Sequence, residues 1–339
     1  MAFSPTIDEL RRAVDDAIAA DLRRRAAALP EARFLIDEMW RLTAAGGKRL
    51  RPAFCYWGYR AAGGEHGEPI LRAAASLELL HTFAIVHDDI MDAADERRGE
   101  ETVHARHGVG VGILVGDLAL VLADDAFMRA GFPPEATARA FAAYSRMRQE
   151  VIAGQYLDLA YSGRTDISVD EARRVAVLKS GRYSIEEPLA IGAALAGASD
   201  EFLARLAEFG RPLGEAFQLR DDLLGTFGDR SHVGKPVDSD ITEGKRNVLY
   251  AFAAAAASGD DAQLLRARWG GDALTADEIA RLRGIVESSG ARAATETLLE
   301  AQVAVARAGL DALGAGAGWG TDEGAALEEL VYLATARRR

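Results

Sequence analysis

Residues 78–98 read ELLHTFAIVHDDIMDAADERR, and this stretch decides the fold class. It begins as an apolar run without the alternation of a β-strand, so we expect a helix that carries Asp88, Asp89 and Asp92 near its end. Asp88 and Asp92 are one helical turn apart and share a face, with Cβ atoms ~6 Å apart. Like charges among apolar neighbours need a cation between them, and oxygen ligands favour Mg²⁺. A solvated acidic helix end is the alternative for this motif alone.

Helices are expected along nearly the whole chain. Capping-box signatures predict helix starts at Thr6 with Glu9, Ser168 with Glu171, and Thr275 with Glu278. Clusters of glycine, proline and polar residues predict breaks at residues 61–69, 131–134, 162–166, 228–240 and 288–290. The chain shows neither a fixed-period repeat nor a strong linker. We therefore expect an all-α fold with a single domain over residues 1–339.

Composition excludes several classes of protein. The 339 residues are 49% hydrophobic and 27% charged, which is a globular composition. A net charge of -12 argues against a general nucleic-acid binder, so any phosphate must be bound by local cations. A single cysteine, Cys55, excludes an internal disulfide framework. The N-terminus lacks a signal pattern, and the longest charge-free stretches, 188–199 and 247–259, are shorter than the ~18 residues of a membrane span. We expect a cytoplasmic protein without a membrane span.

A second acidic motif lies at residues 217–225, which read FQLRDDLLG. Asp221 and Asp222 again occur in an apolar helical context, and Gln218 precedes them by about one turn. Two acidic pairs that face each other across a helical bundle could hold several Mg²⁺ ions. Mg²⁺ commonly bridges a few carboxylates to substrate phosphates, which indicates a diphosphate as the third party.

Cations occur in segments that could meet such a diphosphate. Residues 46–52 read GGKRLRP, where the glycines allow a tight turn and Lys48 and Arg51 could grip an anion. The alternative for this segment is an ordinary cationic helix cap. Lys179 precedes Gly181, where we expect a helix to break. Further cations are Arg97, Arg98, Lys235 and Lys245. Arg97 and Arg98 could instead form ion pairs with the neighbouring Glu96 and Glu100.

The ordered set of motifs resembles the trans-isoprenyl diphosphate synthase family. The matching segments are GGKRLRP, HDDIMD followed by RRG, GQYLD at 154–158, KSG, FQLRDDLLG and GKP…GK, which span residues 46–245. The resemblance implies the isoprenoid-synthase fold, a single bundle of long helices around a deep central cavity, and usually a homodimer. It also implies a prenyltransferase that joins isopentenyl diphosphate head-to-tail to dimethylallyl, geranyl or farnesyl diphosphate, with three Mg²⁺ ions.

The resemblance also implies a role for each residue that matches a family motif. The metal ligands would be Asp88, Asp92 and Asp221, supported by Asp89 and Asp222. The allylic diphosphate would be bound by Arg97, Lys179, Ser180, Gln218, Lys235 and Lys245. The isopentenyl diphosphate would be bound by Lys48, Arg51, His81 and Arg98. Without the resemblance, His81 would be interpreted as a satisfied histidine on an apolar face.

Three positions depart from the family pattern. Gly225 stands where many relatives have a third aspartate, which removes one carboxylate from the second acidic motif. Asp238 replaces a common glycine and Asn247 a common threonine. Because Asp221 is retained, we expect metal binding to survive, while the departures put the detailed geometry of the following loop in question.

In this family, bulky side chains before the first acidic motif limit the length of the product. Phe83 is bulky, whereas its neighbour Ala84 is small, and Leu80 could form a second floor one turn further along. This intermediate pattern predicts a C20 product, with C15 and C25 as the alternatives.

Two other functions fit part of the pattern. A class I terpene cyclase also has an aspartate-rich helix, but it does not need GGKRLRP, RRG or a second Asp-Asp pair. A non-catalytic subunit of a heteromeric synthase is the other alternative, although such subunits typically lose acidic motifs and this chain keeps both.

We predict that Phe83→Ala lengthens the product. A helix rises ~1.5 Å per residue, so Phe83 lies ~7–8 Å from Asp88 along the axis, where the tail of a metal-anchored substrate would run. If Phe83 is only a core residue, truncation should instead destabilise the fold by ~3–5 kcal/mol without changing the product. Chromatography of dephosphorylated products and melting temperatures separate the two outcomes.

Overall fold

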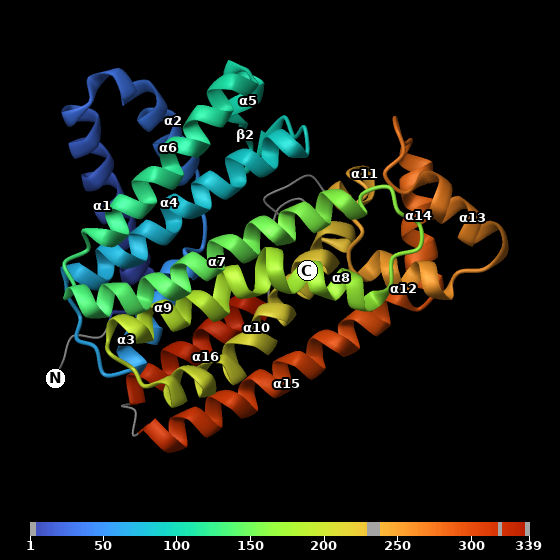
Figure 1. The fold of residues 1–339 in the computed structure, drawn as a ribbon. Coiled ribbons are helices and arrows are strands. Elements are labelled where there is room, and N and C mark those ends of the chain that lie inside the picture. Colours follow the sequence, from blue (N-terminus) through green and yellow to red (C-terminus); the bar gives the residue numbers. More distant parts are fainter. Residues whose placement is uncertain (1–4, 229–237, 318–320, 336–339) are drawn as a thin grey trace. The chain divides into compact units, whose positions relative to one another are not determined.

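The computed structural model describes residues 5–228, 238–317 and 321–335, which are almost entirely helical (Figure 1). The all-α prediction is therefore confirmed. The sequence did not predict the hairpin of two short antiparallel strands, in which Glu96 pairs with Glu101. In chain order the elements are α1 (Ile7–Ala28), η1 (Pro30–Ala32), α2 (Arg33–Ala44), α3 (Leu50–Ala61), α4 (Glu68–Met91), β1 (Glu96–Arg97), β2 (Glu100–Glu101), α5 (Val103–His107), α6 (Val109–Met128), α7 (Pro134–Tyr161), α8 (Val169–Ala176), η2 (Val177–Glu186), α9 (Glu187–Leu195), α10 (Asp200–Phe227), α11 (Ser239–Thr242), α12 (Val248–Ala256), α13 (Gly259–Arg268), α14 (Ala276–Ser288), α15 (Ala291–Ala317) and α16 (Thr321–Thr335).

The chain divides into two compact units. The first unit comprises Met1–Tyr144, Pro188–Ala204 and Gly314–Leu330, and the second comprises Ser145–Glu187, Arg205–Leu313 and Val331–Arg339. The acidic end of α4 belongs to the first unit, whereas the second acidic motif on α10 belongs to the second unit. The single domain over residues 1–339 and its central cavity stay predictions.

The first unit is built around α4. Residues 73–80 of this helix are all buried, and α6 packs along it (Figure 1). Helix α1 adds a buried face whose apolar residues recur every fourth position, at Leu10, Val14, Ile18 and Leu22. By length and composition α4 could cross a membrane, but 67% of its most apolar stretch is buried, as in the core helix of a soluble protein.

Helices α3 and α9 of the first unit cross with their backbones in contact. A Cβ atom at Gly192 would lie 1.8 Å from the carbonyl oxygen of Cys55, and one at Gly58 would lie 2.3 Å from that of Leu189. Only glycine fits at such a crossing. Cys55 is fully buried there as a free thiol, and burial raises its pKa far above the ordinary value.

The second unit has its own apolar core, which fixes the segment that leads into α12. The indole of Trp269 lies in this core and donates a hydrogen bond to the carbonyl oxygen of Lys245 at 3.0 Å. The Arg246 guanidinium lies 4.3 Å above the centre of the Tyr250 ring. The backbone around Lys245 is therefore held on both sides by buried aromatic residues.

The predicted helix starts agree with the structure. Reciprocal hydrogen bonds form the capping box of Thr6 and Glu9 at α1, and the same arrangement begins α8 and α14. Each box satisfies two backbone donors that would otherwise lack a partner at the helix start. These three predictions are confirmed.

The prediction of a helix break at Gly181 is wrong. The chain stays helical there but widens into a π-helix, η2, which runs from Val177 to Glu186. Close packing accompanies the widening: a Cβ atom at Gly181 would lie 2.8 Å from the backbone of Gly214, and one at Gly154 would lie 2.4 Å from the amide nitrogen of Lys179. Such π-helical turns occur frequently at functional sites, and this one carries Lys179.

Candidate active site

An acidic pair at the end of α4 is bound by an arginine of the hairpin. Arg97 donates from Nε to Asp89 at 2.7 Å, and its Nη2 lies 3.3 Å from Asp88. Burial alone would lower the pKa of Arg97, but the carboxylates of Asp89 and Asp88 outweigh it and raise the pKa. Asp92 caps the helix one turn after Asp88, and its amide donates to the Asp88 carbonyl oxygen at 2.8 Å. The predicted spacing of Asp88 and Asp92 is thus confirmed.

Cations from three separate segments gather in the same unit. Arg98, from the hairpin, donates a hydrogen bond to the carbonyl oxygen of Gly46. Burial, followed by the positive charges of Arg51 and Arg98, holds the pKa of His81 well below its ordinary value. His81 is therefore neutral near pH 7 and can donate a hydrogen bond without adding charge. Lys48 is exposed on the loop that precedes Arg51. The structure thus brings Arg51 and Arg98 close enough to His81 for their charges to act on its imidazole, and such a cluster could bind an anion.

Arg49 holds this loop in place, and the sequence did not predict its role. Its side chain is 3% exposed and donates to the carboxylates of Asp15 at 2.6 Å and Glu78 at 3.1 Å. It also donates to the carbonyl oxygens of Thr43 and Gly46 at 2.6 and 3.1 Å. The signal was present in the motif, since Arg49 and Lys48 are adjacent cations, but only the fold buries one and exposes the other.

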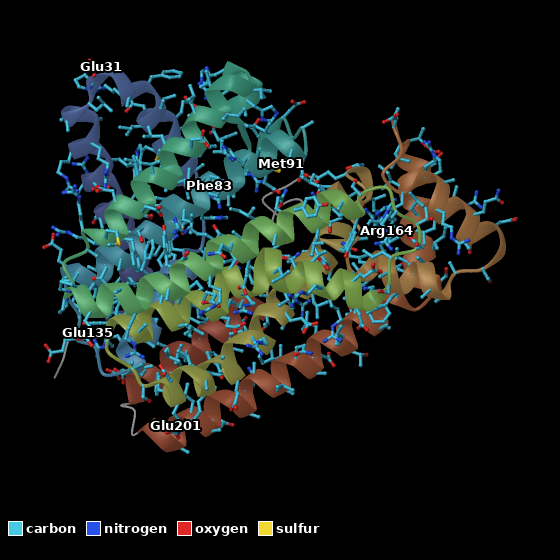
Figure 2. All side chains as sticks on the ribbon, viewed as in Figure 1. Glu31, Phe83, Met91, Glu135, Arg164 and Glu201 are labelled. Atoms are coloured by element: carbon cyan, nitrogen blue, oxygen red, sulfur yellow. The ribbon has the colours of Figure 1, made fainter. Side chains whose placement is uncertain are left out.

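The predicted product-length residues lie on α4. Leu80 is fully buried, whereas Phe83 and Ala84 are partly exposed. Figure 2 labels Phe83, together with Met91 at the end of the same helix. The Phe83 ring packs edge-on against the imidazole of His87, with ring centroids 4.9 Å apart. Leu80 is therefore a core residue in this structure, whereas Phe83 and Ala84 retain exposed surface.

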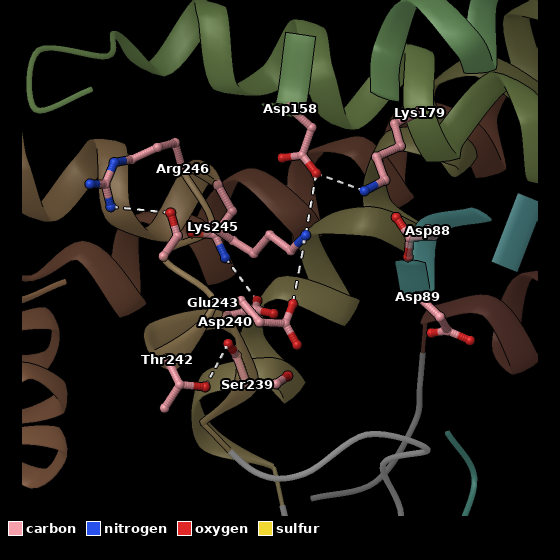
Figure 3. A network of polar contacts seen from close by, with 12 residues as sticks. Asp88, Asp89, Asp158, Lys179, Ser239, Asp240, Thr242, Glu243, Lys245 and Arg246 are labelled. Carbon is pink, nitrogen blue, oxygen red and sulfur yellow. Dashed lines mark hydrogen bonds and ion pairs between the residues drawn. The ribbon is translucent and has the colours of Figure 1, made fainter. Parts of the chain in front are cut away.

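Two predicted lysines of the second unit share one carboxylate. Asp158 on α7 lies 2.7 Å from Lys179 Nζ and 3.5 Å from Lys245 Nζ, and Lys245 lies 3.6 Å from Glu243 (Figure 3). Asp158 therefore positions both ammonium groups. It belongs to the GQYLD motif, but a lone carboxylate on a helix gives no sequence signal that identifies its partners. Ser180 lies beside Lys179 in η2 and is partly exposed.

In the second acidic motif, Asp222 is buried beside like charges, whereas Asp221 is partly exposed. Asp222 is 3% exposed, and Gln218 donates to its Oδ1 at 2.7 Å. Burial, followed by the carboxylates of Asp240 and Asp221, raises the pKa of Asp222 well above the ordinary value. Among the described residues its Oδ2 has no hydrogen-bond partner.

The three departures from the family pattern are in one place. A Cβ atom at Gly225 would lie 2.6 Å from the carboxylate of Asp240, so this side chain occupies the space over the glycine. Asn247 donates to Asp240 at 2.9 Å, and Asp238 forms an ion pair with Arg283. Asn247 also caps α12 by accepting from the Tyr250 amide at 3.0 Å. The geometry therefore supplies a carboxylate beside the motif even though residue 225 is glycine.

The acidic residues suit Mg²⁺, an ion that does not need a binding site made of protein ligands alone. In the part of the chain that the structure describes, no three His, Cys, Asp or Glu side chains form a metal-holding group. Mg²⁺ is usually bound by one or two carboxylates together with water and substrate phosphates, and a bound cation would relieve the repulsion at Asp222. Lys235, the remaining predicted phosphate ligand, lies outside the described residues.

The chain is similar in sequence and structure to prenyl diphosphate synthases. The model of the family described as polyprenyl synthetase matches residues 33–286. Geranylgeranyl diphosphate synthase of Sulfolobus acidocaldarius is 40% identical over 222 residues, which cover 63% of this chain and 65% of that protein. Geranylfarnesyl diphosphate synthase of Aeropyrum pernix is 36% identical over 74% of this chain and 78% of that protein. The structure of geranylgeranyl pyrophosphate synthase from Corynebacterium glutamicum, complexed with isoprenyl diphosphate and magnesium, has a TM-score of 0.93 and 34% identity, covering 98% of this chain and 100% of that one.

We predict that Gly225→Ala destabilises the protein by ~1–3 kcal/mol, because the new methyl group must displace the Asp240 carboxylate. Gly284→Ala is the matched control, since Gly284 is also inside a helix of the second unit and a Cβ atom placed there would have no neighbour within 4 Å. The control should be stabilising by ~0.5–1 kcal/mol. Urea unfolding measures both, and equal stabilisation by the two substitutions would show that Asp240 does not occupy the space over Gly225.

Proposed function

We propose that this chain makes geranylgeranyl diphosphate. The chain belongs to the polyprenyl synthetase family and is a prenyltransferase of the all-α isoprenoid-synthase fold. The proposed reaction condenses isopentenyl diphosphate head-to-tail with an allylic diphosphate, namely the dimethylallyl, geranyl or farnesyl compound, and depends on Mg²⁺. Its C20 product is the one named by the relatives from Sulfolobus acidocaldarius and Corynebacterium glutamicum.

The observation that carries the proposal is that the first unit contains both a group of carboxylates at the end of α4 and a cluster of cations around His81. The carboxylates of Asp88 and Asp92 can attract a diphosphate only through a cation. The cluster of Arg51, His81 and Arg98 can bind one directly. In the proposed reaction the allylic substrate loses its diphosphate and isopentenyl diphosphate keeps its own. The two substrates therefore need different diphosphate sites, one that uses metal ions and one that does not.

The allylic half of the proposed site makes diphosphate a good leaving group. Asp88, Asp92 and Asp221 would hold the metal, which we propose to be three Mg²⁺ ions. When bound, these ions would neutralise the charge that develops on the diphosphate. Lys179 and Lys245, held by Asp158, would contact the same diphosphate together with Arg97, and Ser180 and Gln218 would give polar support. The allylic C–O bond then breaks with its electron pair on oxygen, which leaves an allylic carbocation.

The other half of the proposed site holds isopentenyl diphosphate without promoting the loss of its diphosphate group. Arg51, Arg98 and Lys48 supply positive charge, and the neutral His81 donates a hydrogen bond. The isopentenyl double bond supplies the electron pair of the new carbon–carbon bond to the carbocation. A proton is then lost to an oxygen of the departing diphosphate, which restores a double bond. A site closed to water prevents capture of the cation as an alcohol.

Phe83 and Ala84 support a C20 product, with C15 and C25 as the alternatives. A bulky residue followed by a small one blocks the substrate tail only in part. The similarity to a geranylfarnesyl diphosphate synthase is the reason to retain C25 as an alternative. Mass spectrometry of the wild-type product decides between the three lengths.

Helix α6 supports the proposal that the protein is a homodimer. Its exposed residues include Val109, Ile113, Leu114, Val121 and Met128, which give the helix an apolar surface within one unit. Sedimentation equilibrium tests this, and a monomer at micromolar concentration contradicts it. We further propose a cytoplasmic location, which the buried free thiol of Cys55 suits.

The decisive experiment is incubation of the purified protein with labelled isopentenyl diphosphate, an allylic diphosphate and Mg²⁺. Chain-elongated diphosphate supports the synthase. Release of a hydrocarbon would indicate a terpene cyclase, and inactivity without a second protein would indicate a non-catalytic subunit.

Asp88→Ala and Asp221→Ala should each lower kcat by about 10²–10³-fold, because each removes a metal ligand worth ~3–4 kcal/mol to the transition state. Asp16→Ala and Asp311→Ala are the controls, since both residues are exposed on helices. Steady-state kinetics at saturating Mg²⁺ measure the effect, with circular dichroism to confirm folding. Wild-type turnover in either site variant would contradict the metal assignment.

Arg51→Ala should raise the KM for isopentenyl diphosphate more than the KM for the allylic substrate. Loss of one charged hydrogen-bonding partner costs ~1.5–3 kcal/mol, or about 10–100-fold. Arg72→Ala is the control, because Arg72 is exposed on α4 and pairs with the exposed Glu68. An effect confined to the allylic KM would show that the two diphosphate sites have been exchanged.

A further inference from the structure

His87 lies between Phe83 and α6. Its ring meets the Phe83 ring edge-on, with centroids 4.9 Å apart and planes inclined at 67°. On the other side, His87 Nε2 lies 3.3 Å from the carbonyl oxygen of Ile113 and 3.7 Å from the carboxylate of Asp117. The imidazole is therefore a bridge from α6 to the phenylalanine ring, and its side chain is 20% exposed.

Gly116 on α6 provides the space for this imidazole. A Cβ atom at Gly116 would lie 2.2 Å from His87 Nε2 and 2.3 Å from His87 Cδ2. The residue is helical, so its backbone conformation does not require glycine, and glycine inside a helix costs ~1 kcal/mol relative to alanine. The contact with His87 accounts for a glycine at this position. Gly110 differs, since no atom lies within 4 Å of a Cβ atom placed there.

We infer that His87 is a positioning residue for Phe83, and that Gly116 helps to determine product length by allowing His87 to pack against α6. This inference rests on the proposed function, in which Phe83 limits the growing chain. A ring that blocks a hydrocarbon tail must resist being pushed aside, and Phe83 is only partly buried. The edge-on contact with a hydrogen-bonded imidazole supplies that resistance.

A purely structural role for the contact makes a different prediction. Edge-on aromatic pairs also stabilise cores, so loss of His87 could lower the melting temperature and leave the products unchanged. The distribution of product lengths in a folded variant is the readout that separates positioning from packing.

The test compares the products of His87→Ala, Gly116→Ala, the double variant and the control Gly110→Ala, with labelled isopentenyl diphosphate in excess over farnesyl diphosphate. We expect His87→Ala to raise the share of products longer than the main wild-type product by about 3–10-fold, as expected for loss of one aromatic contact. Gly116→Ala should act in the same direction, because its methyl group moves the imidazole away from Ile113. Gly110→Ala should keep the wild-type distribution.

The double variant tests whether the two residues act together. Since Gly116 is inferred to act through His87, the double variant should make products no longer than His87→Ala alone. Because His87 adjoins Asp88, His87→Ala can lose activity for that reason, and Gly116→Ala then decides the outcome.

Phe83→Ala distinguishes failure of the inference from failure of the proposed function. Longer products from Phe83→Ala, with wild-type products from folded His87→Ala and Gly116→Ala, would overturn the positioning role and leave the product-length role of Phe83 intact. Unchanged products from all three would overturn both. A wild-type protein that forms no prenyl diphosphate would overturn the proposed function itself.

Discussion

A buried guanidinium at the start of α3 is the constraint on which the loop between α2 and α3 depends. Placing Arg49 in the core is costly unless every donor is paired, and removal of one partner of a buried ion pair typically costs ~3–5 kcal/mol. The carboxylates of Asp15 and Glu78 meet that need together with the carbonyl oxygens of Thr43, near the end of α2, and Gly46, in the loop, and these contacts hold the loop in place. Arg98 donates to Gly46 in this same loop. The arrangement of the cations around His81 thus depends in part on Arg49, a residue that is not proposed to contact a substrate.

Local charge arrangement explains how a chain with net charge -12 can bind diphosphates. In the first unit, Arg97 offsets one of the two negative charges of the acidic pair of α4, while the cations around His81 carry a local excess of positive charge. In the second unit, Asp158 holds two lysines, and the buried carboxylate of Asp222 is left with like-charged neighbours. Each unit therefore carries both signs of charge at short range. This suits ligands that are themselves anions bound together with cations.

Sequence reasoning predicted the features that depend on local patterns. Helical periodicity, capping boxes and the spacing of Asp88 and Asp92 depend only on neighbours within about a turn. It could not predict that Gly181 lies in a widened helix, because the widening accompanies a close backbone contact with Gly214, far away in the chain. The partners of Asp158 and the side chain that fills the space over Gly225 likewise come from distant segments. The family resemblance supplied roles for residues, but not these contacts.

The burial of Cys55 has a practical consequence for measuring motion. Since the one native thiol is shielded by packed helices and its pKa is raised, it should not react with maleimide probes while the protein is folded. The native chain is therefore already a background suitable for site-specific labelling, without prior removal of a cysteine. A spin label or fluorophore on a single introduced cysteine in each unit would report distances between α4 and α10 in solution, with and without diphosphate.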